Sequence, residues 1–222
     1  MTFSLVIILQ RIQTESFSQL ARTCSQHGAW LMIDDAHGIG VLGKGKGALA
    51  EYNLSLTDVP VYMATLGKAL GSYGAFVAGD DDLIDFLIQF CRSYIYTTAM
   101  PPAIAAASLA ALDLMQTESW RIEHLQQRIA YFRAGAVERK LPILKSDTAI
   151  QPILVGDSRI AVEISELLRK QGVLVGAIRP PTVPAGTARL RVTLQSEHRE
   201  NEIDRLLDTL AHAFKQFELN QE

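Results

Sequence analysis

Residues 64–71, with the sequence ATLGKALG, decide the fold, together with the apolar run VPVYM that precedes them at 59–63. Earlier in the chain the apolar run at residues 29–33 leads into MIDDAHG, residues 32–38. Short uninterrupted apolar runs are typical of strands that are buried on both faces of a parallel sheet. Each run is followed by polar side chains, Asp34 and His37 after the first and Thr65 and Lys68 after the second. The pattern predicts an α/β sheet that presents an acid, an imidazole, a hydroxyl and an amine at its strand ends.

These four groups suit the cofactor pyridoxal 5'-phosphate (PLP). Lys68 would form a Schiff base with the aldehyde of PLP, and Asp34 would face the pyridine nitrogen. A carboxylate there keeps the ring protonated, so that the ring can accept the electrons of a carbanion. His37 would donate a hydrogen bond to the phenolic oxygen and take part in proton transfer. The alternative interpretations are a solvated strand end or helix cap for Asp34 and a turn residue for His37.

Lys68 has a second expected role as the base that removes the substrate α-proton. A lysine can act in this way when burial or a nearby cation lowers its pKa, and the apolar residues beside Lys68 favour burial. Thr65, a few residues earlier, is placed to bind the PLP phosphate. Lys44 and Lys46 are alternative Schiff-base lysines, but they lie in a glycine-rich loop (38–47) that we expect to be exposed.

The remainder of the chain predicts alternating helices and strands and two domains. Residues 16–27 have helical periodicity, and residues 80–94 form a predicted helix that the acidic cluster at 80–82 would cap. We place a domain boundary near residues 116–120. The expected parts are an atypical N-terminal segment (1–16), the C-terminal part of a large cofactor-binding domain (17–118) and a small α+β domain (119–222).

Composition excludes several classes of protein. The chain has 222 residues, 48% hydrophobic and 20% charged, with a formal net charge of −3, as in an ordinary globular protein. The charges form no blocks, so no nucleic-acid or acidic-membrane surface is indicated. Two cysteines, Cys24 and Cys91, are consistent with buried thiols in a reducing compartment and have no metal-ligand spacing. The apolar run at 3–9 is too short for a membrane span, so we expect a cytoplasmic protein.

A proline-rich loop, AIRPPTVPAGTARLR at residues 177–191, is the second informative stretch. It leads into a strand that carries Arg189 and Arg191 on one face, and an arginine fork is suited to bind a carboxylate. A rigid turn with surface arginines is the alternative.

These stretches, with YTTAMPP at 96–102, together resemble the α-oxoamine synthases, which condense an amino acid with an acyl thioester and release carbon dioxide. The resemblance implies a partial aspartate-aminotransferase-type (fold type I) large domain and a small C-terminal domain. It is strongest, because of the 177–191 loop, to members that join L-alanine to a pimeloyl thioester in biotin biosynthesis, rather than to glycine-using members. It implies that Asp34, His37, Thr65 and Lys68 hold PLP, and that the protein is a homodimer.

The resemblance also implies three further roles. Thr98 would reach the PLP phosphate of the neighbouring subunit. Thr182 would contact substrate, and Arg191, or alternatively Arg189, would bind the amino-acid carboxylate.

The resemblance begins at about Phe17. Family members have a substantial N-terminal portion, which supplies a phosphate-binding turn and a histidine that stacks on the pyridine ring, and residues 3–16 do not match it. We therefore expect a chain that lacks this portion, and two alternatives follow: an active acyltransferase, or a catalytically inactive remnant.

Overall fold

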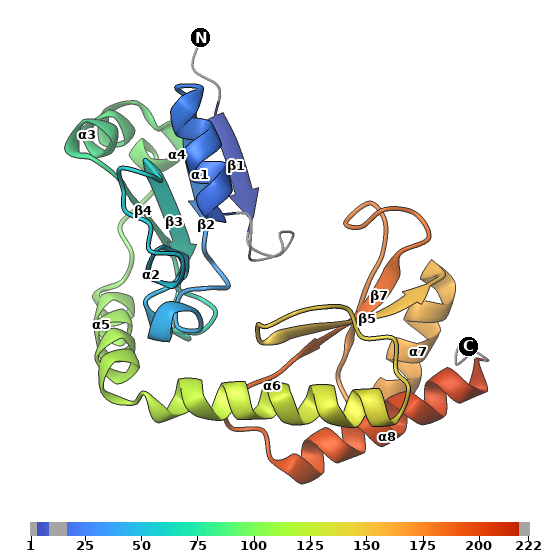
Figure 1. Ribbon diagram of the computed structural model, residues 1–222. Coiled ribbons are helices and arrows are strands. Elements are labelled where there is room, and N and C mark those ends of the chain that lie inside the picture. Colours follow the sequence, from blue (N-terminus) through green and yellow to red (C-terminus); the bar gives the residue numbers. More distant parts are fainter. Residues whose placement is uncertain (1–3, 9–16, 218–222) are drawn as a thin grey trace. The chain divides into compact units, whose positions relative to one another are not determined.

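The computed structural model describes residues 4–8 and 17–217, and residues 4–8 by their backbone alone. The chain divides into two compact units, residues 1–119 and 120–222, and each unit is described by itself. Figure 1 shows the elements of both units. Within the described part of the chain no helix is long and apolar enough to cross a membrane.

The first unit contains a four-stranded sheet in the order β1-β2-β3-β4. Its strands are β1 (Ser4–Ile8), β2 (Trp30–Asp34), β3 (Val61–Thr65) and β4 (Ala75–Ala78). The strands β1, β2 and β3 are parallel, which confirms the predicted α/β sheet.

Strand β1 shows that part of the atypical N-terminal segment (1–16) pairs with the sheet. Its backbone pairs in register with β2, from Ser4 opposite Trp30 to Ile8 opposite Asp34. The run of leucine, valine and isoleucine at residues 5–8 has the β-branched composition that favours a strand. The other residues of that segment, 1–3 and 9–16, lie outside the described part of the chain.

Strand β4 is antiparallel to β3, with Thr65 opposite Ala75. The connection between them, residues 66–74, contains no helix. A parallel return would need a longer crossover, usually through a helix, so this short turn can only bring the chain back antiparallel.

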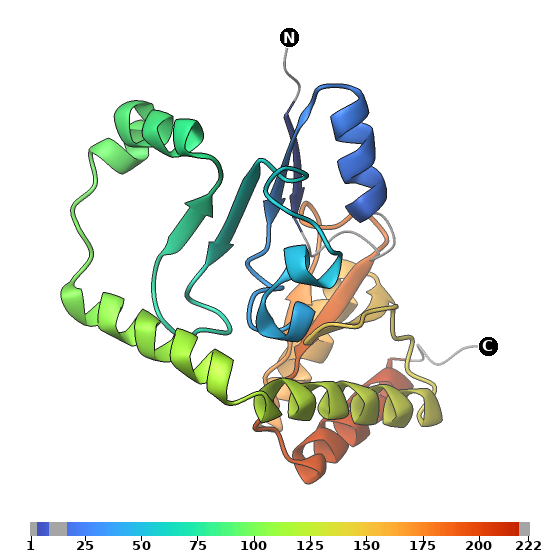
Figure 2. The ribbon, with the colours of Figure 1, turned by 60° about the vertical axis from the view of Figure 1, so that its left-hand side comes forward.

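One face of this sheet is covered and the other is open, which corrects the expectation of a strand buried on both faces. Helix α1 (Phe17–Gln26) lies along one face (Figures 1 and 2) and packs its buried residues against Leu31 and Ile33. The intervening residues of β2 point to the opposite face, where Met32 is half-buried and Trp30 is 45% exposed. Among the described residues of this unit, no helix covers that opposite face as α1 covers the first.

The predicted helix at 80–94 is present but is broken at Cys91 into α3 (Asp81–Phe90) and α4 (Arg92–Ile95). Asp80 caps α3 as expected, because its side chain accepts a hydrogen bond of 2.7 Å from the Leu83 N–H. Helix α5 (Pro102–Thr117) follows. In these three helices no described side chain is fully buried, although α5 contacts the turn that follows β3 through Ser108.

The second unit is the predicted small α+β domain fold. Its helices are α6 (Trp120–Glu138), α7 (Ser158–Lys170) and α8 (Glu200–Gln216), and its strands are β5 (Ile150–Gly156), β6 (Gly176–Ile178) and β7 (Ala188–Thr193). The sheet has the order β5-β7-β6 and is antiparallel throughout. Helices α6 and α8 lie side by side (Figure 1), tied by hydrogen bonds of 3.0 Å from the Tyr131 hydroxyl to both carboxylate oxygens of Asp204. Fully buried side chains such as Phe132, Leu190 and Phe214 form the core of this unit.

Candidate active site at the open face of the first sheet

Asp34 and Thr65 lie at the carboxyl ends of neighbouring parallel strands, on the same face of the sheet. Asp34 ends β2 and pairs with Met63 on β3, and Thr65 is two residues beyond Met63. Because side chains alternate along a strand, Asp34, Met63 and Thr65 all point away from the face that α1 covers. The carboxylate and the hydroxyl are therefore presented on the open face.

The two predicted motifs also contact each other beyond the strands. Ile39, which follows His37, packs in one apolar cluster with Ala64 and Leu70 from the Lys68 turn. Gly40 has a positive φ of 77°, and a β-carbon added to it would lie 2.6 Å from the β-carbon of Ala69. Only glycine allows the loop after β2 to approach the Lys68 turn this closely.

Lys68 donates a hydrogen bond of 2.8 Å from its Nζ to Oγ1 of Thr65. Its side chain is exposed, so the expectation that its apolar neighbours bury it is wrong for this structure. The reason lies in the turn: Leu70 points into the cluster with Ile39, and Lys68 points outward. An amine and a hydroxyl are thus paired at the strand end, within reach of solvent.

The turn that carries Lys68 is stabilised by one hydrogen bond within the turn and by one to helix α5. The Gly71 N–H donates to the Lys68 carbonyl at 2.9 Å, and the Ser72 hydroxyl pairs with that of Ser108 on α5 at 2.7 Å. The turn thus has a defined path at the edge of the sheet.

Asp34 and His37 are both half-buried. Oδ1 of Asp34 accepts a hydrogen bond of 3.0 Å from the Ala36 N–H, which folds the chain directly after β2 into a tight turn. This local bond orients the carboxylate and brings His37 into the loop at the same edge.

Asp35 is a residue of this region that our sequence analysis did not single out. Its side chain has no exposed surface, and its Oδ2 accepts hydrogen bonds from the Tyr62 hydroxyl and the Ala48 N–H. The sequence contains a signal for this burial. Asp35 is two and four residues from Ile33 and Leu31, which face α1, so in an extended strand all three side chains point to the same side.

The alternative Schiff-base lysines, Lys44 and Lys46, are both exposed, as expected. Their loop is more ordered than its glycine content suggested, since it contains a 3₁₀ turn, η3 (Gly43–Gly45), and leads into the short helix α2 (Ala48–Glu51). The contacts that join the Lys68 turn to the β2 loop involve Ile39 and Gly40 rather than these lysines.

The remaining predicted site residues lie elsewhere in the chain. Thr98 is exposed in the segment between α4 and α5. Thr182 lies in the proline-rich loop of the second unit, and Arg189 and Arg191 lie on β7, where the buried Leu190 between them points to the opposite face. Their participation in one site with Lys68 stays a prediction.

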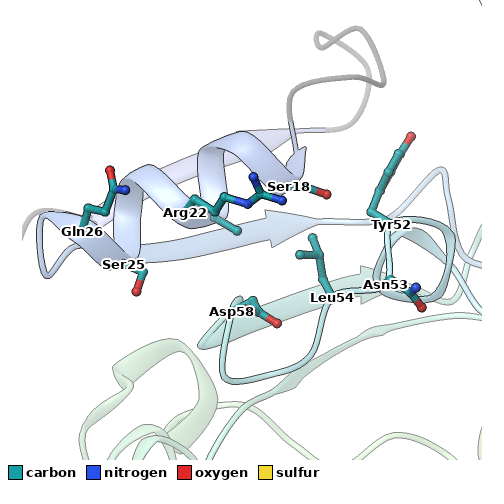
Figure 3. A pocket seen from close by; sticks show the side chains of 9 residues that line it. Ser18, Arg22, Ser25, Gln26, Tyr52, Asn53, Leu54 and Asp58 are labelled. Atoms are coloured by element: carbon teal, nitrogen blue, oxygen red, sulfur yellow. The ribbon is translucent and has the colours of Figure 1, made fainter.

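A pocket also lies on the first unit, between α1 and the segment that follows α2 (Figure 3). Polar side chains dominate its lining, which comprises Ser18, Ala21, Arg22, Ser25, Gln26, Tyr52, Asn53, Leu54 and Asp58. None of the predicted site residues belongs to it. Because α1 covers the opposite face of the sheet, this pocket is separate from the open face that carries Asp34.

The fold and the two motifs at its strand ends define a class of protein. Residues 11–210 match the family model described as "Aminotransferase class I and II", and the chain belongs to this family. Serine palmitoyltransferase of Sphingomonas wittichii has the same fold, with a TM-score of 0.88 at 23% identity, covering 98% of this chain and 56% of that one. The predicted fold class is confirmed.

The similarity extends to particular relatives. The 8-amino-7-oxononanoate synthase of Pseudomonas putida (strain W619) is 55% identical over 200 residues, which cover 90% of this chain and 51% of that protein. The solved 8-amino-7-oxononanoate synthase of Francisella tularensis has a TM-score of 0.80 at 28% identity, covering 98% of this chain and 64% of that one. These relatives confirm the resemblance, and the chain spans about half the length of the curated relatives it matches.

Proposed function

We propose that this chain acts in the PLP-dependent decarboxylative condensation of L-alanine with a pimeloyl thioester, either pimeloyl-CoA or a pimeloyl-carrier protein. The product would be 8-amino-7-oxononanoate, an intermediate of biotin biosynthesis, and the enzyme would be a cytoplasmic homodimer. Curated relatives at about 55% identity carry the name of this enzyme. The structural observation that carries the proposal is the Lys68–Thr65 pair on the same open sheet face as the Asp34 carboxylate.

The residues at this edge fit the chemical groups of PLP. An accessible amine can bond to the aldehyde, a hydroxyl can bind the phosphate, and a carboxylate can pair with the protonated pyridine nitrogen. Two solved serine palmitoyltransferase structures are described as containing PLP. When bound, PLP supplies an electron sink for the carbanion that forms at the substrate α-carbon.

Each residue then has a defined task. Lys68 would hold the cofactor through Nζ and, once the amine of alanine has displaced it and freed Nζ, would take the α-proton of alanine on the same atom. Asp34 keeps a proton on the pyridine nitrogen, and His37 donates a hydrogen bond to the phenolic oxygen. Thr65 binds the phosphate, and Thr98 reaches the phosphate of the neighbouring subunit.

The geometry of β7 favours Arg191 over Arg189 as the carboxylate-binding residue. Arg189 already donates from Nε to the Thr187 carbonyl at 3.1 Å and from Nη2 to the Thr187 hydroxyl at 3.3 Å. Arg191 is exposed, and within the described part of the chain its guanidinium makes no hydrogen bond or ion pair. Arg191 is therefore available for a bidentate interaction with a carboxylate, with Thr182 as a further substrate contact.

A second candidate is a catalytically inactive chain, the remnant alternative of the sequence analysis. One observation favours it: among the described residues of the first unit, no helix lies on the sheet face that carries Asp34, and this face exposes apolar side chains, Trp30 at 45% and Val77 at 40%. Catalysis on PLP depends on a site that excludes water.

Chemical labelling tests the proposal. The purified chain is incubated with PLP, reduced with borohydride and digested, and we expect the pyridoxyl group on the peptide that contains Lys68. Lys68→Ala should remove the label, while the double variant Lys44→Ala/Lys46→Ala should keep it. Label on residues 44–46 instead of Lys68 would overturn the assignment.

An absorbance spectrum of the loaded protein, recorded before and after addition of L-alanine, separates the two candidates. A change that requires Lys68 supports the active enzyme, and a spectrum that does not respond supports the inactive chain.

A further inference from the structure

We propose that Asp35 is a positioning residue that closes the loop of residues 36–47 and thereby fixes His37 and Asp34 at the edge of the sheet where β2 ends. This inference rests on the proposed function, because only that function gives His37 and Asp34 a role in catalysis. The contacts of Asp35 are independent of it.

One carboxylate oxygen joins three elements. Oδ2 of Asp35, directly after β2, accepts a hydrogen bond of 2.5 Å from the Tyr62 hydroxyl on β3 and one of 2.8 Å from the Ala48 N–H at the start of α2. Asp35 and Ala48 are thirteen residues apart, so their bond closes the loop that carries His37. The carboxylate thus anchors the far end of the loop to its beginning and to the sheet.

Glycines at both ends of the loop make room for this carboxylate. A β-carbon added at Gly38 would overlap Oδ1 of Asp35, and one added at Gly47 would overlap Oδ2. Gly47 also has a positive φ of 86°, which favours glycine over other residues. The two glycines that flank the loop therefore wrap its backbone around the Asp35 side chain.

The backbone of Asp35 fixes the path toward His37. The Asp35 N–H donates to the Met63 carbonyl at 2.8 Å, and the Asp35 carbonyl accepts from Gly38 and Ile39 at 3.0 and 3.1 Å. Oδ1 of Asp35 has no hydrogen-bond partner of its own. The Gly38 N–H donates to the Asp35 carbonyl, and it also interacts favourably with the carboxylate. Removal of the side chain would leave the buried Tyr62 hydroxyl and Ala48 N–H without their acceptor, which destabilises this arrangement.

Burial raises the pKa of Asp35, while the hydrogen bonds from Tyr62 and Ala48 partly offset this rise and the neighbouring Asp34 charge adds to it. A carboxyl whose pKa is higher in the folded than in the unfolded state stabilises the fold at low pH, and this contribution is lost as pH rises through the folded pKa. The loop should therefore loosen on the alkaline side of that titration. Asparagine at position 35 keeps an acceptor but cannot titrate.

Hydrogen exchange of the protein without PLP tests the inference. We compare the wild type with Asp35→Ala, Asp35→Asn and Tyr62→Phe, and use Asp58→Asn as a matched control, since Asp58 accepts two hydrogen bonds from Ser55, outside this loop. Asp35→Ala should speed exchange of amides 36–48 by about tenfold or more, the effect of losing about 1.4 kcal/mol of local stability. Tyr62→Phe should have a smaller effect on the same amides, and Asp35→Asn the smallest. Asp58→Asn should leave these amides unchanged.

The position of His37 is read separately from its NMR resonance, assigned with a His37→Gln variant. Loosening of the loop should move the His37 resonance toward that of a solvent-exposed histidine in Asp35→Ala. The resonance should not move in Asp58→Asn. In the wild type the protection of amides 36–48, expressed relative to their intrinsic exchange rates, should fall with rising pH, and in Asp35→Asn this fall should be absent.

Unchanged exchange of 36–48 in Asp35→Ala overturns the inference, and so does faster exchange with an unmoved His37 resonance, which would leave Asp35 a purely structural role. If Asp35→Ala does not fold, the same two readouts in Tyr62→Phe decide. None of these measurements requires PLP. Failure of the wild type to bind PLP would therefore contradict the proposed function alone.

Discussion

At the scale of the residue, two adjacent aspartates have opposite environments because they point to opposite faces of one sheet. Asp34 is half-buried on the open face, where its carboxylate is available to a ligand. Asp35 is fully buried beneath the loop and is held by Tyr62 and Ala48. Because side chains alternate along a strand, Asp34 is available to contact a ligand, while Asp35 is available to hold the loop in position.

Substitution of Asp34 tests its assigned task. Asp34→Asn should still bind PLP, because Lys68 and Thr65 remain, but a neutral amide cannot hold a proton on the pyridine nitrogen. We expect exchange of the alanine α-proton to slow by about 100-fold, equivalent to about 3 kcal/mol, the scale of one lost preorganised electrostatic interaction. The measurement is deuterium incorporation into L-alanine in D₂O, followed by NMR, with Asp58→Asn as the unaffected control. An Asp34→Asn variant that exchanges the proton at the wild-type rate would contradict the role.

At the scale of the element, helices α3, α4 and α5 form from local sequence signals and contribute little to a core. The described residues of these helices include no fully buried side chain, and Phe86 and Phe90 of α3 are 58% and 66% exposed. Without packing, the stability of a ten-residue helix depends heavily on its termini.

The N-cap of α3 gives a test at this scale. Asp80→Ala removes the acceptor for the Leu83 N–H and should destabilise α3 by about 1 kcal/mol. Hydrogen exchange of residues 83–90 should rise about fivefold, while that of α7 stays constant. Asp82→Ala, which changes an acid in the same first turn that is not the cap residue, should have a smaller effect. Equal effects of the two substitutions would show that charge at the helix end, rather than the cap, stabilises α3.

At the scale of the whole molecule, the two units differ in how completely they bury their apolar surface. The second unit packs three helices and a sheet around side chains such as Phe132, Leu207 and Phe214. In the first unit α1 and parts of α2 and α5 pack against one face of the sheet, and exposed apolar residues remain on the other face and on α3–α5.

This difference predicts the course of limited proteolysis. Cleavage should begin within residues 80–118, where the helices have no buried residues, and should leave a resistant fragment from about residue 120 onward. Mass spectrometry of the fragments identifies the sites. Leu207→Ala should remove the resistance of the second unit, since truncation of a fully buried leucine costs about 2–5 kcal/mol. An N-terminal fragment that outlasts the second unit would contradict the prediction.

Much of the secondary structure was predictable because its signals are local. The helical periodicity of residues 16–27, the Asp80 cap and the apolar runs of β2 and β3 all correspond to observed elements. The helix break at Cys91 was not predicted, because no proline or glycine in the neighbouring sequence indicates it. The backbone of Cys91 is extended (φ −77°, ψ 99°). Strand β1 was missed because a five-residue apolar run has meaning only once its partner strand is known.

The sequence by itself determined which groups are available and in what order: Asp34 and His37 after one strand, Thr65 and Lys68 after the next. It determined these because covalent order and strand-end placement are local properties. Only the tertiary structure decided which face each group occupies, because burial depends on which helix covers the sheet. The loop of residues 36–47 enclosed Asp35 on the side of the sheet that α1 covers, while Asp34 stayed half-buried at the open face and Lys68 stayed exposed beside Thr65.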